Sequence, residues 1–140
     1  MTAGMECDTV YDASYADGTS ISDIRKRDRA GQLVLLGAKS SDASDEFALA
    51  AIGDYDKVFA ESADAENADT TENRGTFWYL TTKAMGFAPV EHVSTHSCDT
   101  ATEDGRQRLC WHLSGSGGYR AGESIALNTN TVWRSNGTRL

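Results

Sequence analysis

The chain is poor in several features that would point to common classes of protein. It contains one proline and three cysteines among 140 residues, and 39% of its residues are hydrophobic. Its mean hydropathy is −0.47. It has no run of about 18 apolar residues, so we expect no membrane-spanning helix. The length suits one domain with its own core rather than two.

The start of the chain lacks both the basic stretch and the apolar core of a signal peptide. Either a leader has been removed, or the protein does not use that route, as with a virion component made inside a host cell. Both alternatives are compatible with a location outside cells or on a cell or virion surface.

Negative charge dominates most of the chain, whose formal net charge is −8. Residues 1–105 contain 20 acidic and 8 basic side chains, whereas residues 106–140 contain 1 and 5. Nucleic-acid binding normally needs a basic surface that displaces counterions, so we expect no nucleic-acid partner. The basic C-terminal part suits an anionic ligand such as an acidic polysaccharide, or its arginines pair with the acidic body of the same domain.

Catalytic signatures are weak, and we expect no enzyme. His96, Cys98 and Asp99 bring reactive side chains together, but a catalytic triad requires groups that converge in space from separate elements. The Gly-x-Ser-x-Gly motif of a serine hydrolase does not occur.

Three cysteines leave at least one thiol without a partner inside the chain. Cys98 and Cys110 flank a polar loop that can bring two strands together, and we expect a disulfide between them, in an oxidising compartment. Cys7 is then free to link subunits. The alternative is three reduced cysteines, two of them packed in the interior.

Acidic clusters in loops are candidates for calcium sites, because Ca²⁺ prefers oxygen ligands supplied by loops. The candidate ligands are Asp42, Asp45 and Glu46. Their spacing does not match an EF-hand, and a solvated acidic surface is the alternative.

Short apolar or alternating segments separated by glycine-rich turns predict an all-β fold, an antiparallel β-sandwich or jelly roll with one short helix. Residues 1–20 are predicted to be a polar, irregular arm, and residues 21–140 a single β domain. The helix is predicted from Ser22 to Gly31, and residues 61–75 form an exposed loop. The predicted strands are Gln32–Gly37, Glu46–Gly53, Lys57–Ala60 and Thr76–Thr81, with weaker ones at Met85–Ala88 and at His92. The alanines of Glu46–Gly53 also favour a helix, which is the alternative for that segment.

A β-hairpin is predicted around the run Ser114–Gly118. Before it, Leu109, Trp111 and Leu113 alternate with polar residues, which indicates a strand with one buried face. After it, a return strand begins at Tyr119. We expect Trp111, like Trp78, to lie in the core.

The motifs of this hairpin resemble a small domain of marine-animal skeletal organic-matrix and adhesion-type proteins. They are Arg-Leu-Cys-Trp-His at 108–112, Gly-Gly-Tyr-Arg-Ala-Gly at 117–122, Leu-Asn at 127–128 and Trp-Arg at 133–134. Similar stretches occur in algal and microbial surface proteins, and the resemblance covers roughly residues 30–134. It implies an extracellular, non-enzymatic module that binds glycans or matrix components.

Two departures from that family pattern concern the last part of the chain. Many members have a cysteine where this chain has Ala121, so their usual bridge to the cysteine of the Leu-Cys-Trp-His motif cannot form here. Members usually end in an apolar strand, whereas this chain ends Ser135-Asn-Gly-Thr-Arg-Leu. A missing last strand, or an edge that another subunit completes, is therefore expected.

Aromatic and basic residues near the C-terminus are candidates for sugar binding. Aromatic rings stack on the apolar faces of pyranoses, while arginines and asparagines hydrogen-bond the hydroxyls. The candidate ligand-binding residues are Tyr119, Arg120, Asn128, Asn130, Trp133 and Arg134. The sequence therefore predicts a lectin-like, surface-displayed adhesion module. The alternative is a structural subunit of a filament, matrix or virion that self-associates through its N-terminal arm and its C-terminal edge.

Overall fold

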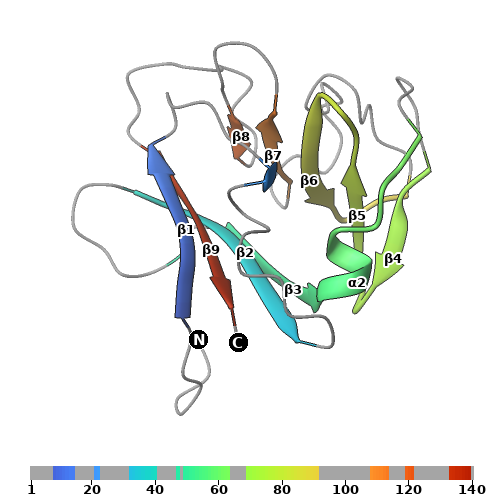
Figure 1. Cartoon of the computed structure of the whole chain (residues 1–140), viewed down its shortest axis with the longest axis horizontal. Helices are drawn as coiled ribbons and strands as arrows, with labels where there is room; N and C mark the ends of the chain where they lie inside the picture. Colours follow the sequence, from blue (N-terminus) through green and yellow to red (C-terminus); the bar gives the residue numbers. More distant parts are fainter. Residues whose placement is uncertain are drawn as a thin grey trace.

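A computed structural model arranges the chain as two antiparallel β-sheets (Figure 1). It describes residues 8–14, 21–22, 32–40, 47, 49–63, 69–91, 108–113, 119–121 and 133–139. The first sheet has the strand order β1 (Asp8–Ser14), β9 (Trp133–Arg139), β2 (Leu33–Ser40) and β3 (Leu49–Asp54). The second has the order β4 (Thr71–Asn73), β5 (Thr76–Leu80), β6 (Ala84–Ala88), β7 (Leu109–His112) and β8 (Tyr119–Ala121). A short helix, α2 (Tyr55–Val58), links β3 to the second sheet.

These elements confirm the predicted all-β antiparallel fold with a short helix. The strands expected at 32–37, 46–53, 76–81 and 85–88 are present, and β7 pairs with β8 as the predicted hairpin. In the second sheet, strands that are consecutive in the chain are neighbours, so it is a meander. The strand expected at His92, and most of the helix expected after Ser22, lie outside the described residues.

The strand predicted at Lys57–Ala60 is wrong, because part of this segment belongs to helix α2. Its apolar residues Tyr55, Val58 and Phe59 are spaced at i, i+3 and i+4, which places them on one side of a helix. The rings of Tyr55 and Phe59 have centroids 4.8 Å apart, and Val58 is fully buried. Helical spacing therefore buries these side chains together.

Three further predictions are wrong, because polar segments of the chain form strands. Residues 8–14 of the supposedly irregular arm form β1, and part of the expected loop 61–75 forms β4. The polar C-terminal stretch forms β9, which pairs with β1 on one side and with β2 on the other. An open or missing C-terminal edge is thus wrong. Backbone pairing, rather than a hydrophobic pattern, defines these strands.

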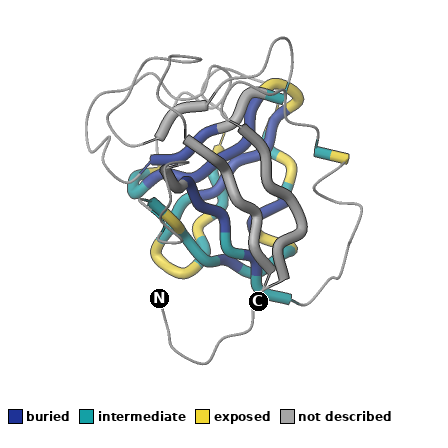
Figure 2. Tube along the Cα trace, turned by 90° about the vertical axis from the view of Figure 1, so that its left-hand side faces the viewer, coloured by how far each residue is buried: buried dark blue, intermediate teal, exposed yellow. Residues whose placement is uncertain are grey.

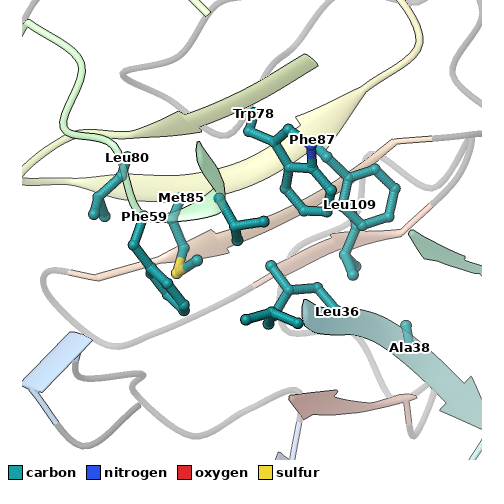
Figure 3. Close-up of a cluster of buried hydrophobic side chains, with 10 residues drawn as sticks. Leu36, Ala38, Phe59, Trp78, Leu80, Met85, Phe87 and Leu109 are labelled. Carbon is teal, nitrogen blue, oxygen red and sulfur yellow. The ribbon is translucent and has the colours of Figure 1, made fainter. Parts of the chain in front are cut away.

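One hydrophobic cluster joins the two sheets (Figure 3). Leu36 and Ala38 of β2 face side chains of the second sheet, including Trp78, Met85 and Leu109. Trp78 is 1% exposed and packs against Phe87, its partner across β5 and β6, with ring centroids 5.2 Å apart. The prediction that Trp78 is a core residue is confirmed. The side chain of Trp111 lies outside the described residues.

Every residue of β6, the central strand of the second sheet, is buried, so this part of the sheet is covered on both faces. Figure 2 shows the buried residues gathered in the interior of the molecule. Tyr79, Ala84, Ala88 and Cys110 form a second buried cluster. At Gly86 a Cβ atom would lie 2.0 Å from the carbonyl oxygen of Leu109. Glycine is therefore required for β6 and β7 to approach each other this closely.

Candidate functional site

The predicted sugar-binding residues that the structure describes begin two different strands. Tyr119 and Arg120 open β8, the last strand of the five-stranded sheet. Trp133 and Arg134 open β9 in the four-stranded sheet. Figure 1 shows β8 and the start of β9 towards the same end of the molecule. Asn128 and Asn130 lie outside the described residues.

The pairing of the strands places the aromatic positions and the arginine positions on opposite faces of each sheet. Tyr119 pairs with Trp111, which pairs with Met85, a residue of the shared core. Because neighbouring positions belong to opposite sheet faces, Arg120 occupies a row of the other face, opposite Cys110.

The same alternation applies in β9. Trp133 pairs with Ser40, two positions after the core residue Ala38, whereas Arg134 pairs with Lys39. The two aromatic positions therefore start strands in rows that face the shared core, and each arginine position follows on the opposite face of its sheet, which for Arg120 is the face of the buried Cys110.

The predicted metal and disulfide residues are only partly described. Asp42, Asp45 and Glu46 lie outside the described residues, as does Cys98. Elsewhere in the described ranges, no group of three or more His, Cys, Asp or Glu side chains lies close enough to hold a metal ion. Cys110 is buried and disulfide-bonded. Its pairing with Cys98 stays a prediction.

Sequence reasoning missed a shallow pocket at the end of β5. Its volume is about 190 Å³, and it is lined by Ile21, Glu61, Ser62, Leu80, Thr81 and Thr82. Three hydroxyls and a carboxylate line the pocket together with the apolar side chains of Leu80 and Ile21. Ile21 and Leu80 are 59 positions apart in the chain, and no motif connects them, so no sequence pattern indicated the pocket.

A polar cluster at the opposite end of β5 was also missed. The side-chain amide of Asn73 donates to Asp54 Oδ2 (2.9 Å), and the Asp54 N–H donates to Asn73 Oδ1 (2.8 Å). The Arg74 guanidinium donates to Asp54 Oδ1 (3.0 Å). The hydrogen bonds from Asn73 and then from Arg74 lower the pKa of Asp54 below its usual value of 3.8.

That cluster depends on the two-residue turn between β4 and β5. Arg74 and Gly75 both have positive φ angles, 55° and 75°, as in a type I′ hairpin turn. The sequence Asn73-Arg-Gly75 between two strands was a recognisable signal for this turn, weakened by arginine at a position that favours asparagine or glycine. We interpret the cluster as a structural connection between the sheets.

Comparisons with protein-family models, curated proteins and solved structures found no match to this chain. Among the described residues, no helix has the length and apolar character needed to cross a bilayer.

Proposed function

We propose that the protein is a non-enzymatic, surface-displayed module that binds carbohydrate. The observation that carries this proposal is the placement of Tyr119 and Trp133 at the starts of β8 and β9, towards one end of the two-sheet fold. A shallow site at the end of a rigid β-scaffold is a common arrangement for a binding surface. The resemblance of roughly residues 30–134 to matrix and adhesion domains supports the same function and an extracellular or surface location.

The arginines that follow these aromatics in sequence are proposed to supply the polar part of the site from the opposite face of each strand, at the same end of the sheets. Arg120 and Arg134 each follow an aromatic position, and a guanidinium offers five N–H donors to sugar hydroxyls. Calcium at Asp42, Asp45 and Glu46 is proposed as an additional ligand that holds a loop or meets a sugar hydroxyl.

A glycan array probed with the labelled full chain, in calcium and in a chelator, tests this function. We expect a restricted set of glycans to be bound, with a weaker signal in the chelator. The absence of binding to any glycan, at a concentration where the protein is folded, would contradict the proposal.

Self-assembly is the second candidate, and the position of β1 favours it. In the part of the chain that the structure describes, β1 is one of the two edge strands of the four-stranded sheet, with β9 on its inner side and β3 at the other edge. An outermost strand can add a strand from another chain. Assembly through the C-terminal edge is excluded, because β9 lies between β1 and β2. Light scattering over a hundredfold concentration range tests assembly, and a monomer throughout would contradict it.

A further inference from the structure

The outer face of the four-stranded sheet, which is turned away from the second sheet, carries accessible apolar side chains. Leu36 of β2 lies in the shared core, so its chain neighbours Leu35 and Gly37 belong to the outer face. Their partners on β3 are Ile52 and Ala50. Leu35 and Ile52 are partly exposed, and Ala50 is exposed. The half of the outer face that β2 and β3 form is therefore apolar.

The ring of Phe47 lies on this outer face, directly above Gly37. A Cβ atom added to Gly37 would lie 2.5 Å from Cδ1 of Phe47, so the ring occupies the space that a side chain would fill. Gly37 is buried, whereas Phe47 is partly exposed. The aromatic ring therefore covers the glycine and still presents part of its surface to solvent.

Strand β9 brings the position of Asn136 beside this ring. Asn136 pairs with Gly37, and Thr138 pairs with Leu35, so both positions belong to rows of the outer face. Neighbouring strands lie about 4.8 Å apart, which places position 136 one strand spacing from the backbone beneath Phe47. A polar strand thus borders the apolar half of the face.

The segment Asn136-Gly137-Thr138 has the pattern Asn-x-Ser/Thr, which is the acceptor pattern for N-linked glycosylation. No other asparagine of the chain has serine or threonine two positions later. After folding, a bulky glycan has to face solvent. Residues two positions apart share a face of a strand, and the register assigns this face to the outside of the sheet.

We propose that Asn136 is a site of N-linked glycosylation and that the first sugar ring of the glycan packs on Phe47. This inference rests on the surface location of the proposed function, because the transfer takes place in the secretory pathway. The side-chain nitrogen of Asn136 forms a bond to C1 of the first N-acetylglucosamine of a lipid-linked oligosaccharide. The bond from C1 to the lipid diphosphate breaks, the diphosphate leaves with the electron pair, and the amide nitrogen loses one proton.

The attached glycan covers the apolar half of the outer face. Aromatic rings pack on the apolar faces of sugars, and Phe47 is the ring beside the attachment position. The following sugars extend over Leu35, Ile52 and Ala50 and shield these side chains from other chains. In this role carbohydrate is carried by the protein, which differs from carbohydrate that the protein binds as a ligand.

Secretion of the full chain from cultured animal cells, behind a cleavable leader, tests the modification. We expect the secreted protein to carry a glycan that peptide-N-glycosidase removes, with Asn136 converted to aspartate in the mass spectrum of its peptide. Thr138→Ser should keep the glycan, whereas Asn136→Gln and Thr138→Val should lose it. Asn128→Gln, which changes an asparagine outside the pattern, is the control and should keep it. A secreted, folded chain with unmodified Asn136 overturns the proposal.

Phe47 distinguishes a glycan that packs on the sheet from one that only projects into solvent. The same chain made without the glycan in the bacterial periplasm provides the reference. We expect the glycan to raise the folding equilibrium constant of the wild type about three- to tenfold, the effect of one ring contact. The gain should disappear in Phe47→Ala and remain in Phe77→Ala, which removes a partly buried ring from β5. An equal gain in wild type and Phe47→Ala overturns the contact with Phe47.

The glycan array and the secretion experiment fail independently of each other. If array glycans bind while Asn136 of the secreted chain is unmodified, the glycosylation site is wrong and the proposed function stands. If Asn136 carries a glycan and the chain binds no array glycan, the carbohydrate-binding function fails and the glycosylation site stands.

Discussion

The guanidinium of Arg74 lies 3.0 Å from a carboxylate oxygen of Asp54, and this ion pair connects the β4–β5 turn to the end of β3. Both side chains are about half exposed, at 51% and 47%. Asp54 stands at the N-cap of α2, yet it makes no side-chain capping bond there. Its carboxylate accepts from Asn73 and Arg74 instead, so the residue ties one sheet to the other.

Acid should weaken this connection. The pKa of Asp54 is lowered in the folded protein, so its contribution to stability is present above the unfolded value near 3.8 and is lost as the pH falls through the lowered folded value. We expect Asp54→Asn to remove the part of the protein's stability that is lost in acid through Asp54. Urea unfolding at pH 7 and pH 2.5 checks it, with Asp56→Asn, an exposed neighbour, as the control. If wild type and Asp54→Asn differed by the same free energy of unfolding at both pH values, this role of Asp54 would be contradicted.

Two glycines should respond very differently to replacement by alanine. At Gly75 the φ angle is 75° and no atom lies within 4 Å of an added Cβ, so alanine costs only backbone strain, about 1–2 kcal/mol. At Gly86 the added Cβ would lie 2.0 Å from a backbone oxygen, and we expect a loss of about 3 kcal/mol or more. Denaturant midpoints measure both. Similar losses at the two positions would show that the approach of β6 and β7 is not as tight as described.

The shared core should depend strongly on Trp78. We expect Trp78→Ala to reduce the free energy of unfolding by about 3–5 kcal/mol, because the ring is 1% exposed and joins the two sheets. Phe77→Ala, at the half-buried neighbouring position, should have a smaller effect. Urea unfolding measures both losses, provided that the slope of the unfolding free energy against urea concentration is unchanged in the variants. An equal loss at both positions would contradict the assignment of Trp78 to the core.

The disulfide of Cys110 can be assigned by its response to single substitutions. We expect Cys98→Ser to open the bridge and lower the stability by about 2–5 kcal/mol, whereas Cys7→Ser should leave no titratable thiol. Thiol titration of the unfolded protein, with mass spectrometry of unreduced peptides, measures both. A bridge that survives Cys98→Ser but not Cys7→Ser would make Cys7 the partner.

Sequence predicted those elements whose own side chains define them. The density of aromatic residues predicted the strand β5, and Trp78 was identified as core because most aromatics of a small domain are buried. In β7 the alternation of apolar and polar residues predicted the strand correctly, but not its burial, because Cys110 on the predicted polar face is also buried. β9 could not be predicted this way, since Arg134, Asn136 and Thr138 resemble a polar tail. Its strand is formed by hydrogen bonding to β1 and β2, which is visible only once those strands are placed.

The candidate sites, too, could be predicted from the sequence only in part. Tyr119 and Trp133 were identified from their residue types, but the register that places them in core-facing rows depends on pairing across the sheets. The pocket of Glu61, Ser62 and Thr82 required contacts between segments far apart in sequence. Convergence of ordinary polar residues leaves no local pattern, so only the fold reveals it.

Binding of the array glycan to Tyr119→Ala is the most direct test of the proposed function. Tyr55→Ala, which removes a ring from α2 at the opposite end of β5, is the matched control, and affinities are compared per folded molecule. We predict that Tyr119→Ala loses at least tenfold in affinity while Tyr55→Ala binds like the wild type. Unchanged glycan affinity in folded Tyr119→Ala would contradict a sugar-binding site at this end of the two sheets.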